Sequence, residues 1–199
     1  MDKLNHVSYA VICEALAGQI ECGDDYLIKE INDGTLFAVV DGLGHGPEAA
    51  FAAKKAIQQL DASADQSIET QFRLCNEVLH GTRGVVMTAM KIDLQYKLTY
   101  LAIGNVIGVI WKVAHNGKLV KGSIFMNNGM LGTRALPSML VKTIELSPGD
   151  TVILATDGLK PQFESESPKF DSPARIAQHM FNTYRNIHDD GLMLVVTIL

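Results

Sequence analysis

The spacing of apolar residues near the N-terminus is typical of β-strands. Apolar-rich runs at Val7–Leu16, Tyr26–Ile31 and Thr35–Val40 predict three strands, because each run is short and bounded by polar residues. The turn at Asn32–Gly34 predicts that the second and third strands form a hairpin, since Asn, Asp and Gly readily adopt turn conformations.

The apolar spacing becomes helical after Gly46. Pro47 suits the first position of a helix, and Glu48 suits the positive end of the helix dipole. A second helix follows, with Gly81 as its predicted stop. The inward-facing residues are Ala49, Ala53, Ile57 and Leu60 in the first helix, and Ile68, Phe72, Cys75 and Leu79 in the second.

The second half of the chain is mostly strand-like. Predicted strands cover Gly84–Ile92, Leu98–Ile103, Val106–Val113, Lys118–Phe125, Val141–Leu146, Thr151–Ala155 and Leu192–Leu199. One further helix is predicted from Ser172-Pro173, with Ile176, Met180, Tyr184 and Ile187 facing inward.

Strands and helices are therefore largely segregated along the chain. This order predicts an α+β fold rather than a doubly wound α/β fold. We expect one domain over residues 1–199, built as two mostly antiparallel β-sheets packed as a sandwich with helices on the outer faces.

Composition and charge narrow the function classes. The chain has 17 Lys and Arg against 22 Asp and Glu, a net charge of −5, and its basic residues are not clustered, which argues against nucleic-acid binding. The three cysteines, Cys13, Cys22 and Cys75, have no Cys-x-x-Cys spacing and favour neither a disulfide framework nor a zinc site. Without a signal-peptide pattern or an apolar run of about 20 residues, we expect a cytoplasmic protein with no membrane partner.

Acidic residues occupy the ends of several predicted strands. Asp41-Gly42 follows one strand directly, Asp157-Gly158 follows another, Asp189-Asp190 precedes the last strand, and Asp24 precedes the second. Each Asp-Gly pair alone is also an ordinary turn dipeptide. Two features argue against that simpler interpretation: both pairs follow nearly continuous apolar runs, and neither is soon followed by a returning strand.

Carboxylates gathered at one edge of a sandwich would repel one another unless cations lay among them. Carboxylate and carbonyl oxygens are the ligands that Mg²⁺ and Mn²⁺ prefer. Because Gly42 has no Cβ, an ion could approach its carbonyl closely. Two such ions about 4 Å apart can activate water and bind a phosphate oxygen, so the pattern points to hydrolysis of phosphate esters.

The segment at residues 39–50, Val-Val-Asp-Gly-Leu-Gly-His-Gly-Pro-Glu-Ala-Ala, resembles the signature of SpoIIE-type serine/threonine phosphatases, the bacterial branch of the metal-dependent type 2C protein phosphatases. Further family-like segments follow the same order over essentially the whole chain. They are Cys22-Gly23-Asp24, residues 84–89, Gly104-Asn105, residues 129–132, Thr156-Asp157-Gly158 and Asp189-Asp190.

The resemblance implies a catalytic centre of Asp41, Asp157 and Asp189 that holds two Mn²⁺ or Mg²⁺ ions. Asp41 would bridge both ions, the Gly42 carbonyl would bind one, and Asp157 and Asp189 would bind the second. Asp24 would hold a metal-bound water in the outer coordination shell, and Asp190 is the alternative to Asp189 as the metal ligand.

The chain departs from the family pattern in two places. The Asp-Asp pair is usually followed closely by Thr, whereas Gly191-Leu192-Met193 stands here. The phosphate-binding arginine of eukaryotic relatives has no equivalent, since no arginine precedes Arg73.

Two polar residues near these motifs have open roles. His45 is either a general acid for the leaving group or a residue that positions its loop, and Asn105 either contacts substrate or holds a strand edge.

The expected function is removal of phosphate from phosphoserine or phosphothreonine in stressosome-type scaffold proteins, which would reset a bacterial stress signal. This substrate class follows from a resemblance in length to the stand-alone feedback phosphatases of stressosomes. One alternative is a phosphatase that acts on a phosphorylated anti-anti-sigma factor. Another is a non-catalytic module with a phosphatase fold that docks a partner, which the intact Asp41, Asp157 and Asp189 disfavour.

Overall fold

The computed structural model describes residues 2–4, 6–136 and 138–199. Its strands form two sheets in which neighbouring strands run antiparallel. The six-stranded sheet has the order β1 (Asp2–Leu4), β2 (Val7–Glu14), β11 (Gly191–Ile198), β10 (Thr151–Ala155), β7 (Ile107–Val113) and β8 (Leu119–Ser123). The five-stranded sheet has the order β3 (Asp24–Ile31), β4 (Gly34–Gly42), β5 (Val85–Asp93), β6 (Lys97–Ile103) and β9 (Lys142–Glu145).

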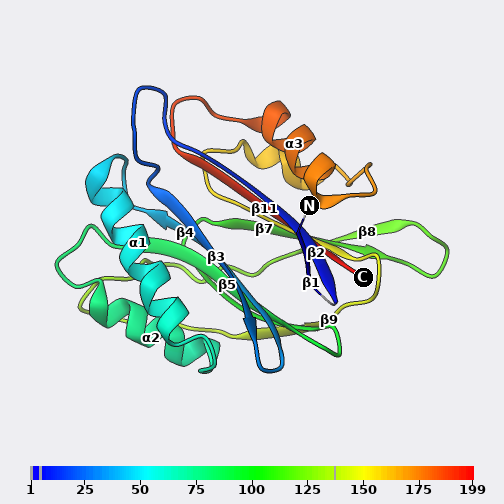
Figure 1. The fold of residues 1–199 in the computed structure, drawn as a ribbon, viewed down its shortest axis with the longest axis horizontal. Helices are drawn as coiled ribbons and strands as arrows, with labels where there is room; N and C mark the ends of the chain where they lie inside the picture. Colours follow the sequence, from blue (N-terminus) through cyan, green and yellow to red (C-terminus); the bar gives the residue numbers. More distant parts are fainter. Residues whose placement is uncertain (1, 5, 137) are drawn as a thin grey trace.

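Helices cover the outer faces of both sheets. α1 (Pro47–Ala62) and α2 (Ile68–Val78) pack against the five-stranded sheet, whereas α3 (Pro173–Tyr184) packs against β2 and β11 of the other sheet (Figure 1). A short 3₁₀ helix, η1 (Pro161–Ser165), precedes α3. The predicted α+β sandwich is therefore confirmed. None of the helices in the described part of the chain is long and apolar enough to cross a membrane.

Alternation along β4 explains how one strand serves two cores. Phe37 and Val39 point into the core between the sheets, whereas Leu36, Ala38 and Val40 point toward α1 and α2. All nine residues of β4 are buried, as expected for a central strand covered on both faces. Continuing the alternation places Asp41 on the face that lies between the two sheets.

The same alternation places other polar residues on this inner face. In β10, Val152 and Leu154 face the other sheet, so Thr156 follows them on that side. In β11, Leu192 and Leu194 do the same, so Asp190 precedes them on that side. Several polar side chains thus meet where the inner faces of the two sheets come to an end.

The sequence prediction was wrong at the end of the third helix. α3 ends at Tyr184, and Ile187, which was expected to face inward, is 67% exposed. The backbone of Arg185 is extended and forms an antiparallel bridge with Leu159. The helix therefore ends before Arg185 and does not continue to Ile187. β1 and η1 were not predicted, and β4 extends through Asp41 and Gly42 rather than ending before them.

Candidate active site

Asp24 and Asp41 lie on neighbouring strands of the five-stranded sheet. Their Cα atoms are paired in the β3–β4 ladder, and both side chains are buried. The Thr156 hydroxyl donates a 2.7 Å hydrogen bond to Asp24 Oδ2, which links the two sheets. Within the described residues, no donor contacts the Asp41 carboxylate.

Asp157 follows β10 and lies at the surface. Its Oδ2 atom accepts a 2.9 Å hydrogen bond from Asn105 Nδ2, which comes from the turn between β6 and β7. The structure therefore places Asn105 beside a predicted ligand.

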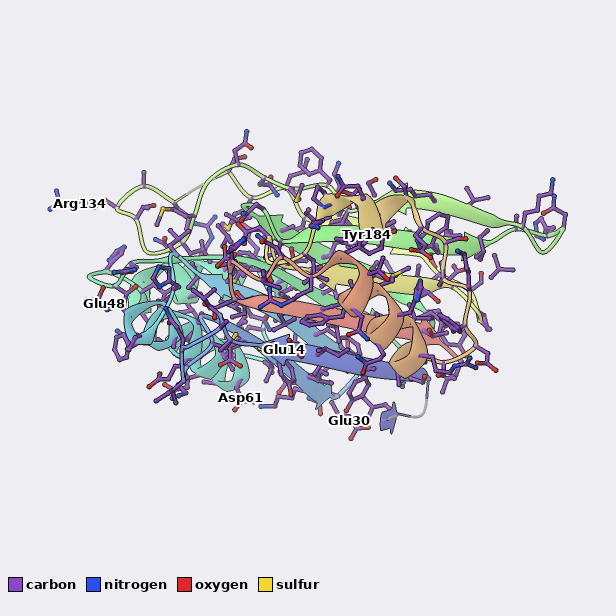
Figure 2. All side chains as sticks on the ribbon, turned by 90° about the horizontal axis from the view of Figure 1, so that it is seen from above. Glu14, Glu30, Glu48, Asp61, Arg134 and Tyr184 are labelled. Carbon is purple, nitrogen blue, oxygen red and sulfur yellow. The ribbon has the colours of Figure 1, made fainter. Side chains whose placement is uncertain are left out.

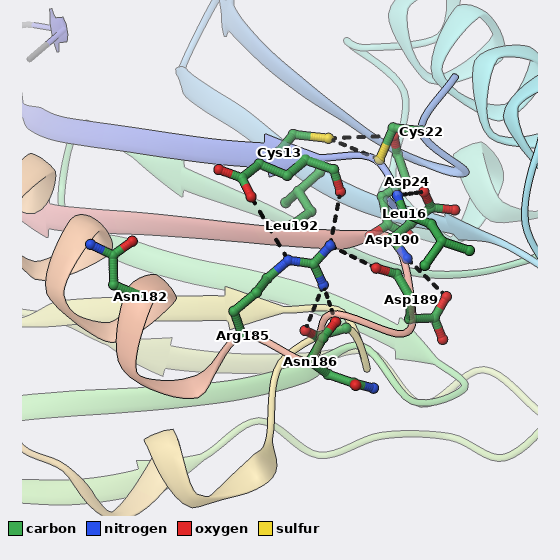
Figure 3. Close-up of polar contacts among 12 residues, drawn as sticks. Cys13, Leu16, Cys22, Asp24, Asn182, Arg185, Asn186, Asp189, Asp190 and Leu192 are labelled. Atoms are coloured by element: carbon green, nitrogen blue, oxygen red, sulfur yellow. Dashed lines mark hydrogen bonds and ion pairs between the residues drawn. The ribbon is translucent and has the colours of Figure 1, made fainter. Parts of the chain in front are cut away.

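Asp189 and Asp190 have different surroundings. Asp190 is buried, and its Oδ1 atom accepts a 2.8 Å hydrogen bond from the Leu16 backbone N–H, while Oδ2 is a buried oxygen without a partner in the described chain. Asp189 is half-buried, and its Oδ1 atom accepts a hydrogen bond from the Asp190 backbone N–H. Figure 3 shows both carboxylates near Asp24.

Close backbone packing explains the glycines that follow two of the aspartates. A Cβ on Gly42 would collide with the Ala49 carbonyl at the start of α1, and a Cβ on Gly158 would collide with the Asp190 carbonyl. The Gly42 N–H also donates to the Gly23 carbonyl at 3.0 Å. The absence of a side chain at Gly42 and Gly158 therefore lets the segments that carry Asp24, Asp41, Asp157 and Asp190 approach one another.

The electrostatics of these carboxylates are unfavourable in the absence of a cation. Burial, followed by the charge of Asp24 and other nearby aspartates, raises the pKa of Asp41 to about 9. Burial likewise raises the pKa of Asp24 to about 7, although the hydrogen bond from Thr156 opposes the shift. Burial and the charge of Asp189 raise the pKa of Asp157, while Asn105 opposes that shift.

This donor set fits a hard divalent cation. The aspartates supply oxygen ligands, and the buried, unpartnered Asp190 Oδ2 together with the raised pKa values show that the site lacks positive charge. In the described chain, no three His, Cys, Asp or Glu side chains converge, as they stand, into a group that could hold a metal ion.

His45 lies in the exposed loop before α1. Its Nδ1 atom is 2.8 Å from Gln19 Nε2, so the imidazole joins this loop to the segment between β2 and β3. This contact favours the loop-positioning role over the general-acid role.

Sequence reasoning did not single out Arg83. The Nε atom of Arg83 lies 2.6 Å from Glu48 Oε2. The guanidinium of Arg83 also packs against Gly44, because a Cβ atom on Gly44 would lie only 2.5 Å from Nη1. No spacing pattern connects Arg83 with Gly44, which lies 39 residues earlier in the chain. Glu48, its partner, lies at the same end of the molecule as Arg134 (Figure 2).

Comparison with known proteins agrees with this architecture. The curated phosphoserine phosphatase RsbX of Bacillus subtilis (strain 168) is 25% identical over 200 residues, which cover 98% of this chain and 96% of RsbX. A crystal structure of RsbX in complex with magnesium superposes with a TM-score of 0.88 at 23% identity, covering 100% of this chain and 98% of that one. A chain from work on the bacterial stressosome, described as a modular system adapted to control secondary messenger signalling, gives a TM-score of 0.83 at 26% identity, covering 96% and 98%.

The fold is therefore that of the type 2C phosphatases. The family model of stage II sporulation protein E (SpoIIE) matches residues 32–198, and the chain belongs to this family. The prediction of a SpoIIE-type phosphatase is confirmed, and the similarity to RsbX extends over nearly the whole of both chains.

Proposed function

We propose that this chain is a divalent-metal-dependent protein phosphatase acting on phosphoserine and phosphothreonine. The observation that carries the proposal is the meeting of aspartates from four separate segments at one end of the sandwich, with Asp41 buried among them and without a donor in the described chain. Membership of the SpoIIE family and the likeness to RsbX support the same activity.

The proposed ligands of two Mn²⁺ or Mg²⁺ ions are Asp41, the Gly42 carbonyl, Asp157 and Asp189, with Asp24 in the outer shell. Asp189 is preferred to Asp190 because Asp189 is half-buried and its charge raises the pKa of Asp157, the other proposed ligand of the second ion. Asp190, whose Oδ2 atom has no partner in the described chain, is the alternative. When bound, the ions would supply Lewis-acid activation of water and neutralise phosphate charge.

The chain's own residues have distinct proposed roles around this centre. Asn105 orients Asp157 through its amide, and Thr156 fixes Asp24 between the sheets. Gln19 holds His45 and its loop at the edge of the site. The proposed reaction transfers the phosphoryl group directly to water, so no cysteine nucleophile is required.

The proposed substrates are phosphorylated stressosome-type scaffold proteins in the cytoplasm. Support comes from the similarity to a chain from work on the bacterial stressosome, at 26% identity. A phosphorylated anti-anti-sigma factor remains the second candidate substrate, and its test is a direct comparison of the two phosphoproteins.

The deciding experiment measures phosphate release from both phosphoproteins, with Mn²⁺ and with a chelator. We expect release that depends on Mn²⁺, faster turnover of the scaffold protein, and a loss of about 10³-fold or more in Asp41→Asn, because that substitution removes the charge that two ions would share. Asp171→Asn, an exposed aspartate before α3, is the matched control and should behave as wild type. Equal activity with the chelator, or full activity in Asp41→Asn, would refute metal-dependent catalysis at this site, and no release from either protein would favour the docking module.

A further inference from the structure

Arg185 lies at the point where several loops of the six-stranded sheet meet. Its guanidinium donates hydrogen bonds to the carbonyls of Gly158 at 3.1 Å, Asp189 at 2.6 Å and Glu14 at 3.4 Å, and also to its neighbour Asn186 (Figure 3). The side chain is 12% exposed. Nearly all of its donor capacity is therefore spent on backbone oxygens.

These carbonyls belong to three segments that are distant in sequence. Glu14 ends β2, Gly158 follows the candidate ligand Asp157, and Asp189 is itself a candidate ligand before β11. The backbone adds two further ties in this region: Asn186 N–H donates to the Gly158 carbonyl, and Lys160 N–H donates to the Tyr184 carbonyl, both at 2.8 Å. Glu14 and Tyr184, which flank this junction, are labelled in Figure 2.

The charge of Arg185 is poorly neutralised by its immediate neighbours. The single carboxylate within ion-pair distance in the described chain is that of Glu14, 3.9 Å from Nε and 61% exposed. A largely buried guanidinium with so weak a partner is costly unless hydrogen bonds and nearby negative charge compensate. The hydrogen bonds are present here, because the guanidinium donates to four backbone carbonyls.

Gly191 provides the room for this arrangement. A Cβ at that position would lie 2.7 Å from Nη1 and 2.8 Å from Cζ of Arg185. The same residue begins the Gly191-Leu192-Met193 departure from the family pattern. The glycine and the arginine thus form a matched pair, since a larger residue would displace the guanidinium.

We propose that Arg185 is a positioning residue, which fixes the Asp157 turn and the Asp189 loop at the spacing that a shared divalent ion requires. The inference rests on the proposed metal-dependent function. It makes two claims that can be tested separately. Without Arg185, the Asp157 turn and the Asp189 loop should both lose order. The affinity for the divalent ion should also fall, while turnover at saturating metal should be largely unchanged.

The test compares Arg185→Met, Arg185→Lys and Gly191→Ala with Arg175→Met as the matched control. Arg175 is an exposed arginine of the same helix region, contacting Asp171 and the Phe170 ring. Mn²⁺ affinity is measured from the electron paramagnetic resonance signal of free Mn²⁺, and phosphate release is measured across a Mn²⁺ titration. Amide hydrogen exchange is followed in the chelated protein over residues 156–160 and 186–191.

We expect the Mn²⁺ dissociation constant to rise about 10- to 100-fold in Arg185→Met, as for other residues that orient metal ligands. Turnover at saturating Mn²⁺ should stay within about threefold of wild type, which a general loss of structure would not produce. Arg185→Lys should recover part of the affinity, because an ammonium group keeps the positive charge and can still donate to a carbonyl. The recovery should be incomplete, because the ammonium group reaches fewer of the carbonyls than the guanidinium does. Gly191→Ala should reproduce the defect with Arg185 intact, and it keeps the test available if Arg185→Met does not fold.

Two outcomes would overturn the inference. One is wild-type Mn²⁺ affinity in folded Arg185→Met and Gly191→Ala, and the other is unchanged hydrogen exchange in both segments. If the wild-type chain itself bound no Mn²⁺, the proposed function would fail, while the exchange measurement would still decide whether Arg185 holds the two segments together.

Discussion

Asp24 and Asp41 face each other directly across the β3–β4 ladder, so two buried carboxylates meet, and among the described residues Thr156 is the one side-chain donor, serving Asp24. Like charges at directly opposed positions in a sheet are destabilising. Burial is the largest cause of the raised pKa of both residues, and the charge of Asp24 adds to the shift of Asp41.

The first prediction concerns the stability of the metal-free protein against pH. The ordinary carboxyl pKa is 3.8, and the folded protein raises it to about 7 in Asp24 and about 9 in Asp41. The folded state therefore binds more protons than the unfolded state in this window, so the free energy of unfolding should fall as pH rises from about 4 to about 9. Urea unfolding in the presence of a chelator at pH 5, 7 and 9 measures this trend.

The comparison that isolates the pair is Asp41→Asn, whose stability should depend less on pH than that of wild type. Asp171→Asn should retain the wild-type slope, because Asp171 is exposed. A wild-type stability that rises steadily over pH 5 to 9 would show that the two carboxylates do not oppose folding.

The Asp24–Asp41 pairing was within reach of the sequence. The turn residues Asn32 and Asp33 pair Ile31 with Gly34, and seven further steps along each strand bring Asp24 opposite Asp41. The sequence analysis placed the turn at Asn32–Gly34, whereas Gly34 already belongs to β4 and pairs with Ile31. A turn that is one residue longer leaves the pairing of the two strands uncertain by one residue, and a shift of one residue changes which side chains share a face of the sheet.

Other parts of the site depend on contacts between distant segments. Arg185 and Arg83 reach the loops around the aspartates from positions that no periodic pattern connects with Gly158 or Gly44. Apolar alternation predicts strands and their faces, but it carries no information on which loop a long polar side chain reaches. For this reason the aspartates and Asn105 could be singled out from the sequence, whereas Arg185 and Arg83 could not.

A second prediction separates the two roles considered for Asn105. Because Asn105 Nδ2 donates to Asp157 Oδ2, Asn105→Ala should raise the Mn²⁺ concentration needed for half-maximal activity about tenfold, with little change in KM for a phosphoserine peptide. The measurement is a Mn²⁺ titration at several peptide concentrations. Asn182→Ala, an exposed residue of α3, serves as the control. A rise in KM alone would instead assign Asn105 to substrate contact.

A third prediction concerns the cysteines. Cys13 and Cys22 lie with their sulfur atoms 3.3 Å apart beside Asp24, and Cys75 is fully buried against α1. Direct transfer of the phosphoryl group to water requires no thiol, so each Cys→Ser variant should keep wild-type turnover per folded molecule. Cys75→Ser should nevertheless lose about 1–3 kcal/mol of stability, because a hydroxyl is placed in an apolar core.

Turnover and thermal unfolding of the three single variants check this directly. Cys13→Ser and Cys22→Ser should unfold near the wild-type temperature, since both positions are partly exposed. Loss of activity in one of these variants, although that variant still folds, would indicate a thiol nucleophile and a different mechanism.

The final prediction addresses His45. Its imidazole is held 2.8 Å from the Gln19 amide, so we expect it to fix the loop between β4 and α1 rather than to protonate the leaving group. His45→Ala and Gln19→Ala should then lower turnover by similar factors, within about tenfold of wild type, and the double variant should be little worse than either single variant, because both remove one contact. The decisive measurement is the rate for phosphoserine peptide compared with an aryl phosphate, whose leaving group needs little protonation. A general acid would make His45→Ala lose far more activity on the peptide than on the aryl phosphate. A positioning residue would make both substrates lose activity equally, and Gln19→Ala would show the same equal loss.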